Sequence, residues 1–364
     1  MEDAVFMPSG VMAQGIALLI HARQGKGNEA GSPKRHFMCH HTSHLLLHED
    51  EAYEELLQME PIVVSTVNNV EENGFGVPPM IYDNVKESLE GWRRDKSKNI
   101  NTIEREKESI IQEKDNDVAA LIVELPHREV GGKCTPWDDI LAMQILCAQN
   151  GIRFHCDGAR LFEATAGYDK TPAQLAEPFD SVYVSFYKGL GGIAGAMLLG
   201  DAEFCTEARK WLRRFGGNLY TLLPYVVSGW SGYRNNWVGP REKNDGQDNL
   251  SFVAKRDKLR TIVATLSNDD GVSEVVSFDP AVPQVNMVHG YLKHDADAIN
   301  RALEEVQAET DIRVLRRVRP VDPALPAFQA GFVSKFELSI GARNGSIHND
   351  IFVDGWKALA KKLQ

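Results

Sequence analysis

The sequence predicts an α/β protein, with a large domain built on a mainly parallel sheet and a smaller α+β domain after it. Short apolar runs alternate with helical patterns through the first two-thirds of the 364-residue chain, a pattern typical of helices layered on a parallel sheet. Around residues 240–248 the composition turns polar and glycine-containing, which indicates a linker. We therefore expect one domain over residues 1–240 and a second over residues 241–364.

Four apolar runs in the first domain have the length and composition of buried strands: Pro61–Thr66, Ala119–Glu124, Arg153–Cys156 and Ser181–Ser185. Trp137–Gln149 lies between the second and third of these runs and has helical periodicity, so strand, helix and strand follow one another as a crossover unit. A further strand is expected at Ala194–Leu199 and a helix at Ala202–Arg214. Lys86–Asp117 is rich in Lys, Glu and Asp, which indicates a solvated helix or an insertion.

The second domain is expected to begin with a helix from about Leu250. A strand near Gln284–His289, a helix near Asp295–Ala308 and a strand near Lys335–Ile340 follow it. This order of elements is that of a small α+β unit.

The composition excludes several classes of protein. The net charge is −11 and no basic stripe stands out, which disfavours nucleic-acid partners. No apolar run approaches the roughly 18–20 residues that cross a bilayer, and Glu2 and Asp3 stand where a signal peptide carries positive charge. The five cysteines are scattered without a CxxC pair, as is typical of reduced thiols in a cytoplasmic protein: Cys39, Cys134, Cys147, Cys156 and Cys205.

Asp157 and Lys188 each follow an apolar strand, in the segments FHCDGAR (154–160) and SFYKGLGG (185–192). Ligands of open α/β sheets lie beyond the carboxyl ends of the strands, so the two side chains are expected to meet in one crevice. A lysine amine and a carboxylate suit pyridoxal 5′-phosphate (PLP): the amine condenses with its aldehyde, and the carboxylate keeps its ring nitrogen protonated. Taken singly, Asp157 also fits a turn and Lys188 a solvated side chain.

Pro8–Ala13 leads into the apolar stretch Gly15–Ala22 and predicts the start of a helix. Free backbone N–H groups and the positive end of the helix dipole at this point would suit a phosphate group. Ser9 is equally suited to cap the helix with no ligand present. The sequence leaves both interpretations open.

Five histidines gather in a short segment: His36, His40, His41, His44 and His48. Two pairs have i, i+4 spacing, but no HExxH motif or other zinc signature accompanies them, so we expect no metal. A histidine lying over a pyridine ring is the functional alternative, and a histidine satisfied within a loop is the plain one.

In this order, the motifs resemble those of the threonine aldolase / β-eliminating lyase family of fold-type I PLP enzymes. The resemblance runs from Ala4 to Tyr220 and is most specific in HCDGARLFEA (155–164) and FDSVYVSFYKGLGG (179–192). It implies that Lys188 holds PLP as a Schiff base and that Asp157 pairs with the pyridine nitrogen. Further cofactor contacts are implied for Arg160, His44, Ser185 and, at the phosphate, Ser9, Gly10 and Val11.

The resemblance also implies the reaction, cleavage of a β-hydroxy-α-amino acid such as L-threonine to glycine and an aldehyde. His44 would stack on the ring with Glu49 as its companion, and His127 would lie near the substrate's β-hydroxyl. Arg160 and Arg213 would lie near the substrate. β-Elimination or another carbon–carbon lyase reaction, or an inactive binding protein, are the alternatives. Members of this family commonly share active sites between subunits, so a homodimer or homotetramer is expected.

Three departures from the family pattern concern the substrate. Only seven residues precede Pro8, where the family has an N-terminal arm. Tyr220 stands in place of an Arg, and Glu337 stands where the C-terminal strand normally offers an Arg to the substrate's α-carboxylate. That carboxylate would then need Arg160, Arg213 or another basic group.

Overall fold

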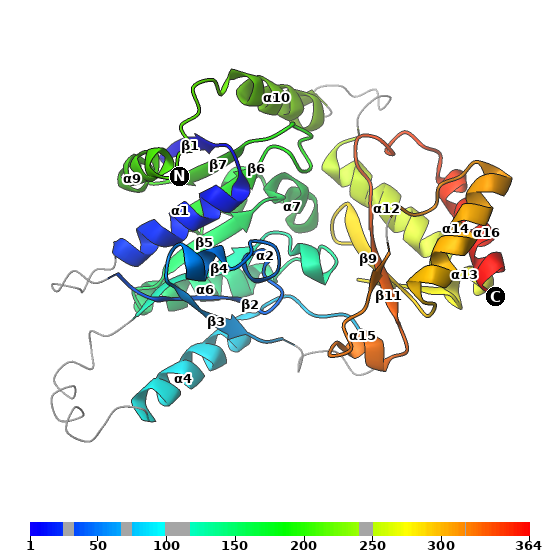
Figure 1. The fold of residues 1–364 in the computed structure, drawn as a ribbon, viewed down its shortest axis with the longest axis horizontal. Coiled ribbons are helices and arrows are strands. Elements are labelled where there is room, and N and C mark those ends of the chain that lie inside the picture. The colour runs from blue at the N-terminus through cyan, green and yellow to red at the C-terminus, as the bar shows by residue number, and fades with distance from the viewer. Residues whose placement is uncertain (25–32, 67–74, 99–116, 240–249, 317) are drawn as a thin grey trace.

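The computed structural model describes residues 1–24, 33–66, 75–98, 117–239, 250–316 and 318–364. It contains a 7-stranded sheet of order β1-β7-β6-β5-β4-β2-β3 and a 4-stranded sheet of order β10-β11-β9-β8, which lie side by side (Figure 1). The α/β fold class is confirmed. The division at residue 240 stays a prediction, and the predicted linker at residues 240–248 lies outside the described residues.

The larger sheet is mainly parallel. Strands β2 to β6 run parallel to their neighbours, whereas β7 is antiparallel to both β6 and β1 at one edge. The strands are β1 Asp3–Met7, β2 His36–His40, β3 Glu60–Val64, β4 Val118–Glu124, β5 Arg153–Gly158, β6 Ser181–Ser185 and β7 Ala196–Gly200.

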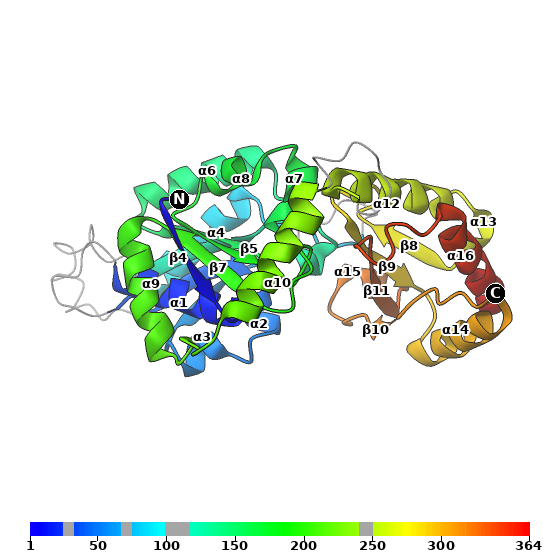
Figure 2. The same ribbon diagram turned by 90° about the horizontal axis from the view of Figure 1, so that it is seen from above.

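Helices cover both faces of this sheet (Figure 2). On one face α1 and α9 pack against β1, β6 and β7 around Ile16, Phe204 and Leu198, and on the other α4 and α6 pack on the strands around Phe154. The helices are α1 Gly10–Arg23, α2 His44–Leu47, α3 Ala52–Glu55, α4 Tyr82–Lys98, η2 Arg128–Val130, α6 Trp137–Gln149, α7 Leu161–Tyr168, α8 Pro172–Ala176, α9 Ala202–Arg214, α10 Leu223–Tyr233 and η3 Arg234–Val238.

The smaller sheet is antiparallel and is covered on one face by helices around the buried Trp356. Its elements are α12 Phe252–Ser267, α13 Asp270–Ser273, β8 Val276–Asp279, β9 Met287–Leu292, α14 Ala296–Thr310, β10 Arg319–Pro320, α15 Pro326–Gln329, β11 Ser334–Ser339 and α16 Asn349–Leu363. Helix α12 contacts both α16 in this unit and α7 in the larger one, so it connects the two cores.

Most predicted elements are present. Ser181–Ser185, Trp137–Gln149 and Ala202–Arg214 have the predicted ends. The strand expected at Gln284–His289 is β9, which begins three residues later. The Lys86–Asp117 segment contributes the second part of α4 up to Lys98, and its residues 99–116 lie outside the described part of the chain.

The histidine segment is not a helix. His36–His40 forms strand β2, between β3 and β4, and α2 begins only at His44. The i, i+4 spacing of His40 and His44 therefore does not place them on one helix face. No helix among the described residues is both long and apolar enough to cross a membrane.

Candidate active site

Polar residues gather at the carboxyl ends of the parallel strands. β5 ends with Asp157 and Gly158, and Asp157 lies opposite Glu124 at the end of β4 in the strand register. β6 ends with Ser185, and Lys188 follows three residues later. The chain leaving β2 reaches His44 within four residues. This is the edge where ligands of open α/β sheets bind.

Asp157 is held firmly at this edge. Its side chain is buried, Oδ2 accepts a hydrogen bond from Gln14 Nε2 at 2.6 Å, and Oδ1 accepts one from the Ala159 N–H at 3.0 Å. Each carboxylate oxygen has more than one lone pair, so Asp157 can still accept a hydrogen bond from a ligand.

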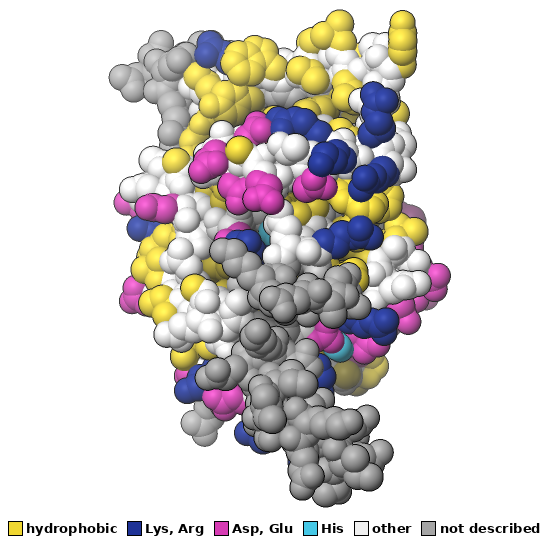
Figure 3. Space-filling model, turned by 90° about the vertical axis from the view of Figure 1, so that its left-hand side faces the viewer, with side chains coloured by type: hydrophobic (Ala, Val, Ile, Leu, Met, Phe, Trp, Pro, Cys, Tyr) yellow, Lys and Arg dark blue, Asp and Glu magenta, His cyan; other side chains and the backbone are white. Residues whose placement is uncertain are grey.

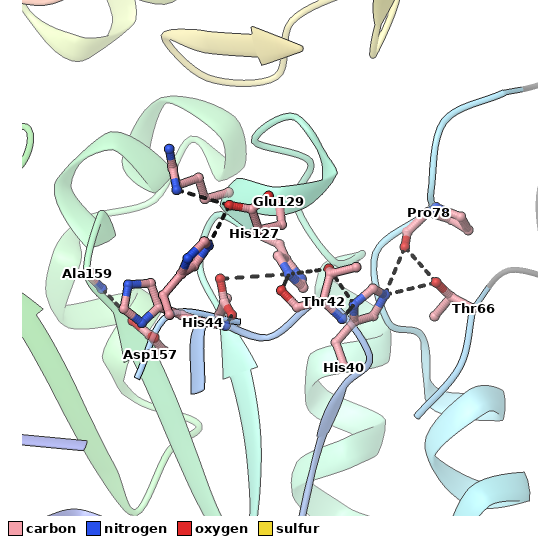
Figure 4. A network of polar contacts seen from close by, with 12 residues as sticks. His40, Thr42, His44, Thr66, Pro78, His127, Glu129, Asp157 and Ala159 are labelled. Atoms are coloured by element: carbon pink, nitrogen blue, oxygen red, sulfur yellow. Dashed lines mark hydrogen bonds and ion pairs between the residues drawn. The ribbon is translucent and has the colours of Figure 1, made fainter. Parts of the chain in front are cut away.

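His44 lies beside Asp157 (Figure 4). Its Nδ1–H donates to Glu49 Oε1 at 2.9 Å, and its backbone N–H donates to Glu124 Oε1 at 2.7 Å. The hydrogen bond to Glu49 raises the pKa of His44, the charge of Asp157 raises it further, and the charge of Lys188 opposes this. The imidazole therefore interacts electrostatically with both Asp157 and Lys188, so the structure brings these three predicted residues together.

His127 lies in a buried polar network next to this cluster (Figure 4). Its Nε2 is 3.1 Å from Thr42 Oγ1 and 3.7 Å from Glu124 Oε2. His40 joins the network through Thr42 and Thr66, and burial lowers the pKa of His40 well below its usual value. His127 is only 3% exposed, and it is connected to the site through Thr42 and Glu124.

Glu163 is a buried carboxyl that the sequence analysis missed. Burial raises its pKa to about 7, although the charges of Arg160, Lys188 and Lys255 oppose the shift. Arg160 Nε is 3.8 Å from Glu163 Oε1, and a Cβ at Gly189 would collide with the Glu163 carboxyl. The DGAR motif and the glycine after Lys188 therefore enclose this side chain.

Glu129 and Arg128, which the sequence analysis did not name, form a second group with His48. His48 packs against His44, with ring centroids 5.0 Å apart, and lies 2.9 Å from Glu129 Oε1. Burial opposes ionisation of Glu129, but the bond to His48 and the charges of Arg128 and Lys335 lower its pKa to about 2.

Glu337, one of the three departures from the family pattern, is paired with Arg128. Arg128 Nε donates to Glu337 Oε2 at 2.8 Å and Nη1 donates to Glu129 Oε1 at 3.0 Å. These residues line a cavity of about 780 Å³ that also contains Arg319 and Lys335. Glu337 thus neutralises Arg128 at the wall of the cavity.

The start of α1 lies where the sequence analysis placed it. Ser9 is the N-cap, and its Oγ accepts the Met12 N–H at 3.2 Å. The N–H groups of Gly10 and Val11 have no partner within the helix, because first-turn donors have no preceding carbonyl. Gly10 has a steric reason as well, since a Cβ there would collide with Tyr183 Oη.

Other predicted residues lie differently. Ser185 is buried and accepts the Tyr187 N–H at 3.3 Å. Arg213 is exposed on α9, and no hydrogen bond or ion pair joins it to Asp157 or His44 in the part of the chain that the structure describes. Tyr220 is fully exposed. The roles of Ser185 and Arg213 stay predictions.

The donor set fits PLP. A half-buried primary amine, a buried carboxylate with both oxygens anchored, an imidazole beside that carboxylate and a helix start meet the needs of its aldehyde, ring nitrogen, ring face and phosphate. Among the described residues no group of three His, Cys, Asp or Glu side chains is arranged to hold a metal ion.

Comparisons with known proteins agree with this arrangement. A low-specificity L-threonine aldolase of Eremothecium gossypii is 25% identical over 223 residues, which are 60% of this chain and 48% of that protein. An alanine racemase of Cochliobolus carbonum is 37% identical over 89 residues, 24% of this chain and 23% of the relative. The chain spans at most about half the length of these curated relatives.

Solved structures match over the whole fold. One from Exiguobacterium sp. 255-15, provisionally described as an aromatic amino acid β-eliminating lyase/threonine aldolase, is 32% identical with a TM-score of 0.75, covering 100% of this chain and 83% of that one. A structure described as SPT with a PLP internal aldimine is 14% identical with a TM-score of 0.57, covering 99% of this chain and 72% of that one, which shows the fold alone. The sequence model of the β-eliminating lyase family matches residues 1–330, and the chain therefore belongs to that family.

Proposed function

We propose that this protein is a PLP-dependent aldolase that cleaves a β-hydroxy-α-amino acid of the L-threonine type to glycine and an aldehyde. The observation that carries the proposal is the meeting of Lys188, Asp157 and His44 at one edge of the parallel sheet. The family match and the L-threonine aldolase relative support it.

Four groups of this chain would hold the cofactor. Lys188 Nζ would form the covalent link to the aldehyde, Asp157 would accept the hydrogen bond of the protonated ring nitrogen, and His44 would lie against the ring. The first turn of α1 would offer the Gly10 and Val11 N–H groups to the phosphate. When bound, PLP accepts the electrons of the bond that breaks.

The β-hydroxyl of the substrate must lose a proton as the Cα–Cβ bond breaks, and we assign that proton to the His127 network. His127 is only 3% exposed, so it acts through the Thr42 hydroxyl, 3.1 Å from its Nε2. Glu124 bonds the His44 backbone N–H through one oxygen and lies 3.7 Å from His127 through the other. It thereby holds the ring-covering residue and the base in a fixed relation.

The α-carboxylate of the substrate needs a cation whose charge is not already neutralised by carboxylates of the protein. Arg128 bonds both Glu129 and Glu337, which leaves it little positive charge to offer. Arg160 follows Asp157 in the DGAR motif, and the carboxyl 3.8 Å from its Nε, that of Glu163, has a pKa of about 7. We therefore assign Arg160 to the carboxylate.

The first test is the absorbance spectrum of the purified protein with PLP, before and after borohydride. A visible band that borohydride abolishes in the wild type and that Lys188→Ala lacks would support the covalent link. Lys361→Ala, at an exposed lysine on α16, should behave as wild type. A wild type without the band, or a Lys188→Ala variant that keeps it, would reject the proposal.

The second test identifies the products. Incubation with L-threonine should release glycine and acetaldehyde, with complete loss of activity in Lys188→Ala. A keto acid and ammonia would instead indicate β-elimination, and interconversion of alanine enantiomers would match the racemase relative. Either result would replace the aldolase reaction while keeping the same site.

Two broader expectations accompany this function. We propose that the protein works as a homodimer or homotetramer, and an exposed apolar face on α10 supports this. We also propose a cytoplasmic location, which the free state of all five cysteines supports.

A further inference from the structure

A continuous chain of hydrogen bonds leads from Asp157 into the core. Gln14 Nε2 donates to Asp157 Oδ2 at 2.6 Å, and Gln14 Oε1 is 2.6 Å from His155 Nε2. His155 Nδ1 is 2.6 Å from Ser181 Oγ, which in turn is 2.7 Å from His21 Nε2. We name Gln14, His155, Ser181 and His21 the Asp157 relay.

The Asp157 relay is closed to solvent. Its four side chains are between 0% and 2% exposed, and the His21 ring stacks on Phe204 with centroids 5.1 Å apart. Gln14 and His21 come from α1, whereas His155 and Ser181 come from the adjacent strands β5 and β6. A polar chain of this kind costs free energy of desolvation unless every member finds a partner.

The carboxylate at one end sets the direction of every bond. Ionised Asp157 only accepts, so Gln14 must present its amide N–H₂ to Asp157 and its oxygen to His155. His155 Nε2 must therefore carry a proton, and a neutral His155 then accepts the Ser181 hydroxyl at Nδ1. Ser181 Oγ in turn accepts from His21 Nε2–H, and His21 Nδ1, which has no partner, is left without a proton.

Both histidines favour the neutral form that this order needs. Burial lowers the pKa of His155 to about 4, although the charge of Asp157 opposes the shift. Burial also lowers the pKa of His21 well below its usual value, and the charge of Arg153 adds to this. The direction of the hydrogen bonds is thus consistent with the protonation of each ring.

We propose that Gln14 and His155 are positioning residues for Asp157, and that the Asp157 relay fixes the orientation and acceptor state of this carboxylate toward the ring nitrogen of PLP. The inference rests on the proposed function. Every dipole in the relay points its positive end at Asp157, so the chain stabilises the ionised carboxylate by the same means as a donor in direct contact. Without Gln14, one oxygen of Asp157 would be buried without a donor.

A purely structural relay would only join α1 to the sheet. It would contribute to thermal stability but would not influence the cofactor. The two roles differ in their effect on PLP affinity and on the pH dependence of the absorbance of bound PLP.

The first experiment needs no cofactor. ¹⁵N spectra of the histidine rings in the full-length protein near neutral pH should show His155 and His21 neutral, with the proton on Nε2 in both. Asp157→Asn should shift the His155 signals. A His155 ring with its proton on Nδ1 alone would overturn the proposal, because Gln14 would then have to turn its N–H₂ group to His155 and its oxygen to Asp157.

The second experiment uses the protein with PLP. Gln14→Leu should raise the dissociation constant of PLP roughly tenfold, by analogy with metal sites, where loss of an outer-shell hydrogen bond weakens binding by that factor or more. It should also move the pH midpoint of the visible absorbance. His155→Gln, which keeps a donor toward Gln14, should restore most of the wild-type behaviour that His155→Leu loses. Gln144→Leu, at a half-buried glutamine outside the relay, is the matched control.

Four other titratable residues interact electrostatically with Asp157, and none of them is substituted in these variants: His44, Glu49, Cys156 and Tyr183. Relay variants that lose thermal stability but keep the wild-type PLP affinity and pH midpoint would overturn the positioning role alone. A wild type that binds no PLP would reject the proposed function together with it, so the two failures are distinct.

Discussion

Glu163 carries a carboxyl group into the interior next to Lys188, and burial raises the pKa of that carboxyl to about 7. An unfolded glutamate has a pKa of about 4.3. The folded state therefore holds a proton on Glu163 that the unfolded state has lost between these two pH values. Below the lower value both states are protonated, so the residue has no effect on stability there.

We expect Glu163→Gln to change the pH dependence of stability. As pH rises from about 4.3 to 7, Glu163 ionises in the unfolded state while the folded state keeps its proton, which destabilises the wild type by up to about 3 kcal/mol, and above pH 7 this penalty is constant. Glutamine cannot ionise, so the variant should gain in stability over the wild type across this range. Urea unfolding at pH 5 and pH 8 measures the difference.

The same substitution at the exposed Glu177 serves as the control, since no buried charge is involved. A stability difference between Glu163→Gln and wild type that is equal at both pH values would contradict the buried, protonated carboxyl. The protonation state of Glu163 also bears on the proposed reaction, because Glu163 interacts electrostatically with Arg160 and Lys188.

Single residues of the site were predictable where they follow a local pattern. Asp157 and Lys188 each end an apolar run, so the sequence itself shows their position on the sheet. Gln14 and His155 carry no such pattern, because 143 residues separate Gln14 from Asp157 and 141 separate it from His155. Glu163 was missed for a related reason: its pKa depends on burial, which the sequence does not give.

Helix α1 offers a prediction at the scale of the element. Ser9 caps it by accepting the Met12 N–H, and the proposed phosphate site uses the same first turn. Ser9→Ala should destabilise the protein by about 1 kcal/mol, as removal of an N-cap does. Ser9→Asp should keep the cap, since aspartate accepts the same hydrogen bond, but should weaken PLP binding on the order of tenfold or more by charge repulsion.

Urea unfolding without cofactor and a PLP titration separate the two effects. Thr171→Asp, at the N-cap of α8, keeps a cap away from the proposed phosphate site and should leave PLP affinity unchanged. If Ser9→Asp binds PLP as tightly as the wild type, the phosphate does not lie at α1.

Elements were harder to predict where neighbours in space decide them. The β2 segment HFMCH was considered only as part of a histidine cluster, yet Phe37, Met38 and Cys39 are completely buried between β3 and β4. Strand β9 was predicted near Gln284–His289, and it runs from Met287 to Leu292. In the structure Gly290 lies inside the strand, since a Cβ there would collide with the Phe336 ring on β11.

At the scale of the whole molecule, the apolar surface of α10 is the feature that bears on assembly. Leu223, Val226, Val227 and Trp230 are each between 44% and 66% exposed. Figure 3 shows hydrophobic side chains gathered along the top of the molecule, where Figure 1 places α10. Exposed apolar surface of this kind marks interaction sites, and a second copy of the chain is the partner we propose.

We expect Val227→Glu with Trp230→Glu to weaken self-association by roughly 30-fold or more, because buried aromatic residues dominate the energy of interfaces. Size-exclusion chromatography with light scattering over a range of protein concentrations measures it. Val282→Glu, at a 64% exposed valine in the smaller unit, is the control. A wild type that stays at the 40.5 kDa of one chain at all concentrations would contradict the homo-oligomer.

Gln14 and His21 lie seven residues apart on α1, and this spacing limits which insertions and deletions the helix can tolerate. Two helical turns bring these side chains to nearly the same face, so both reach the sheet at once. Inserting or deleting one residue between them would turn His21 away by about 100° while Ser9 and Gly10 kept their place. Relatives that keep the buried chain should therefore show substitutions in this stretch of α1 but no length variation.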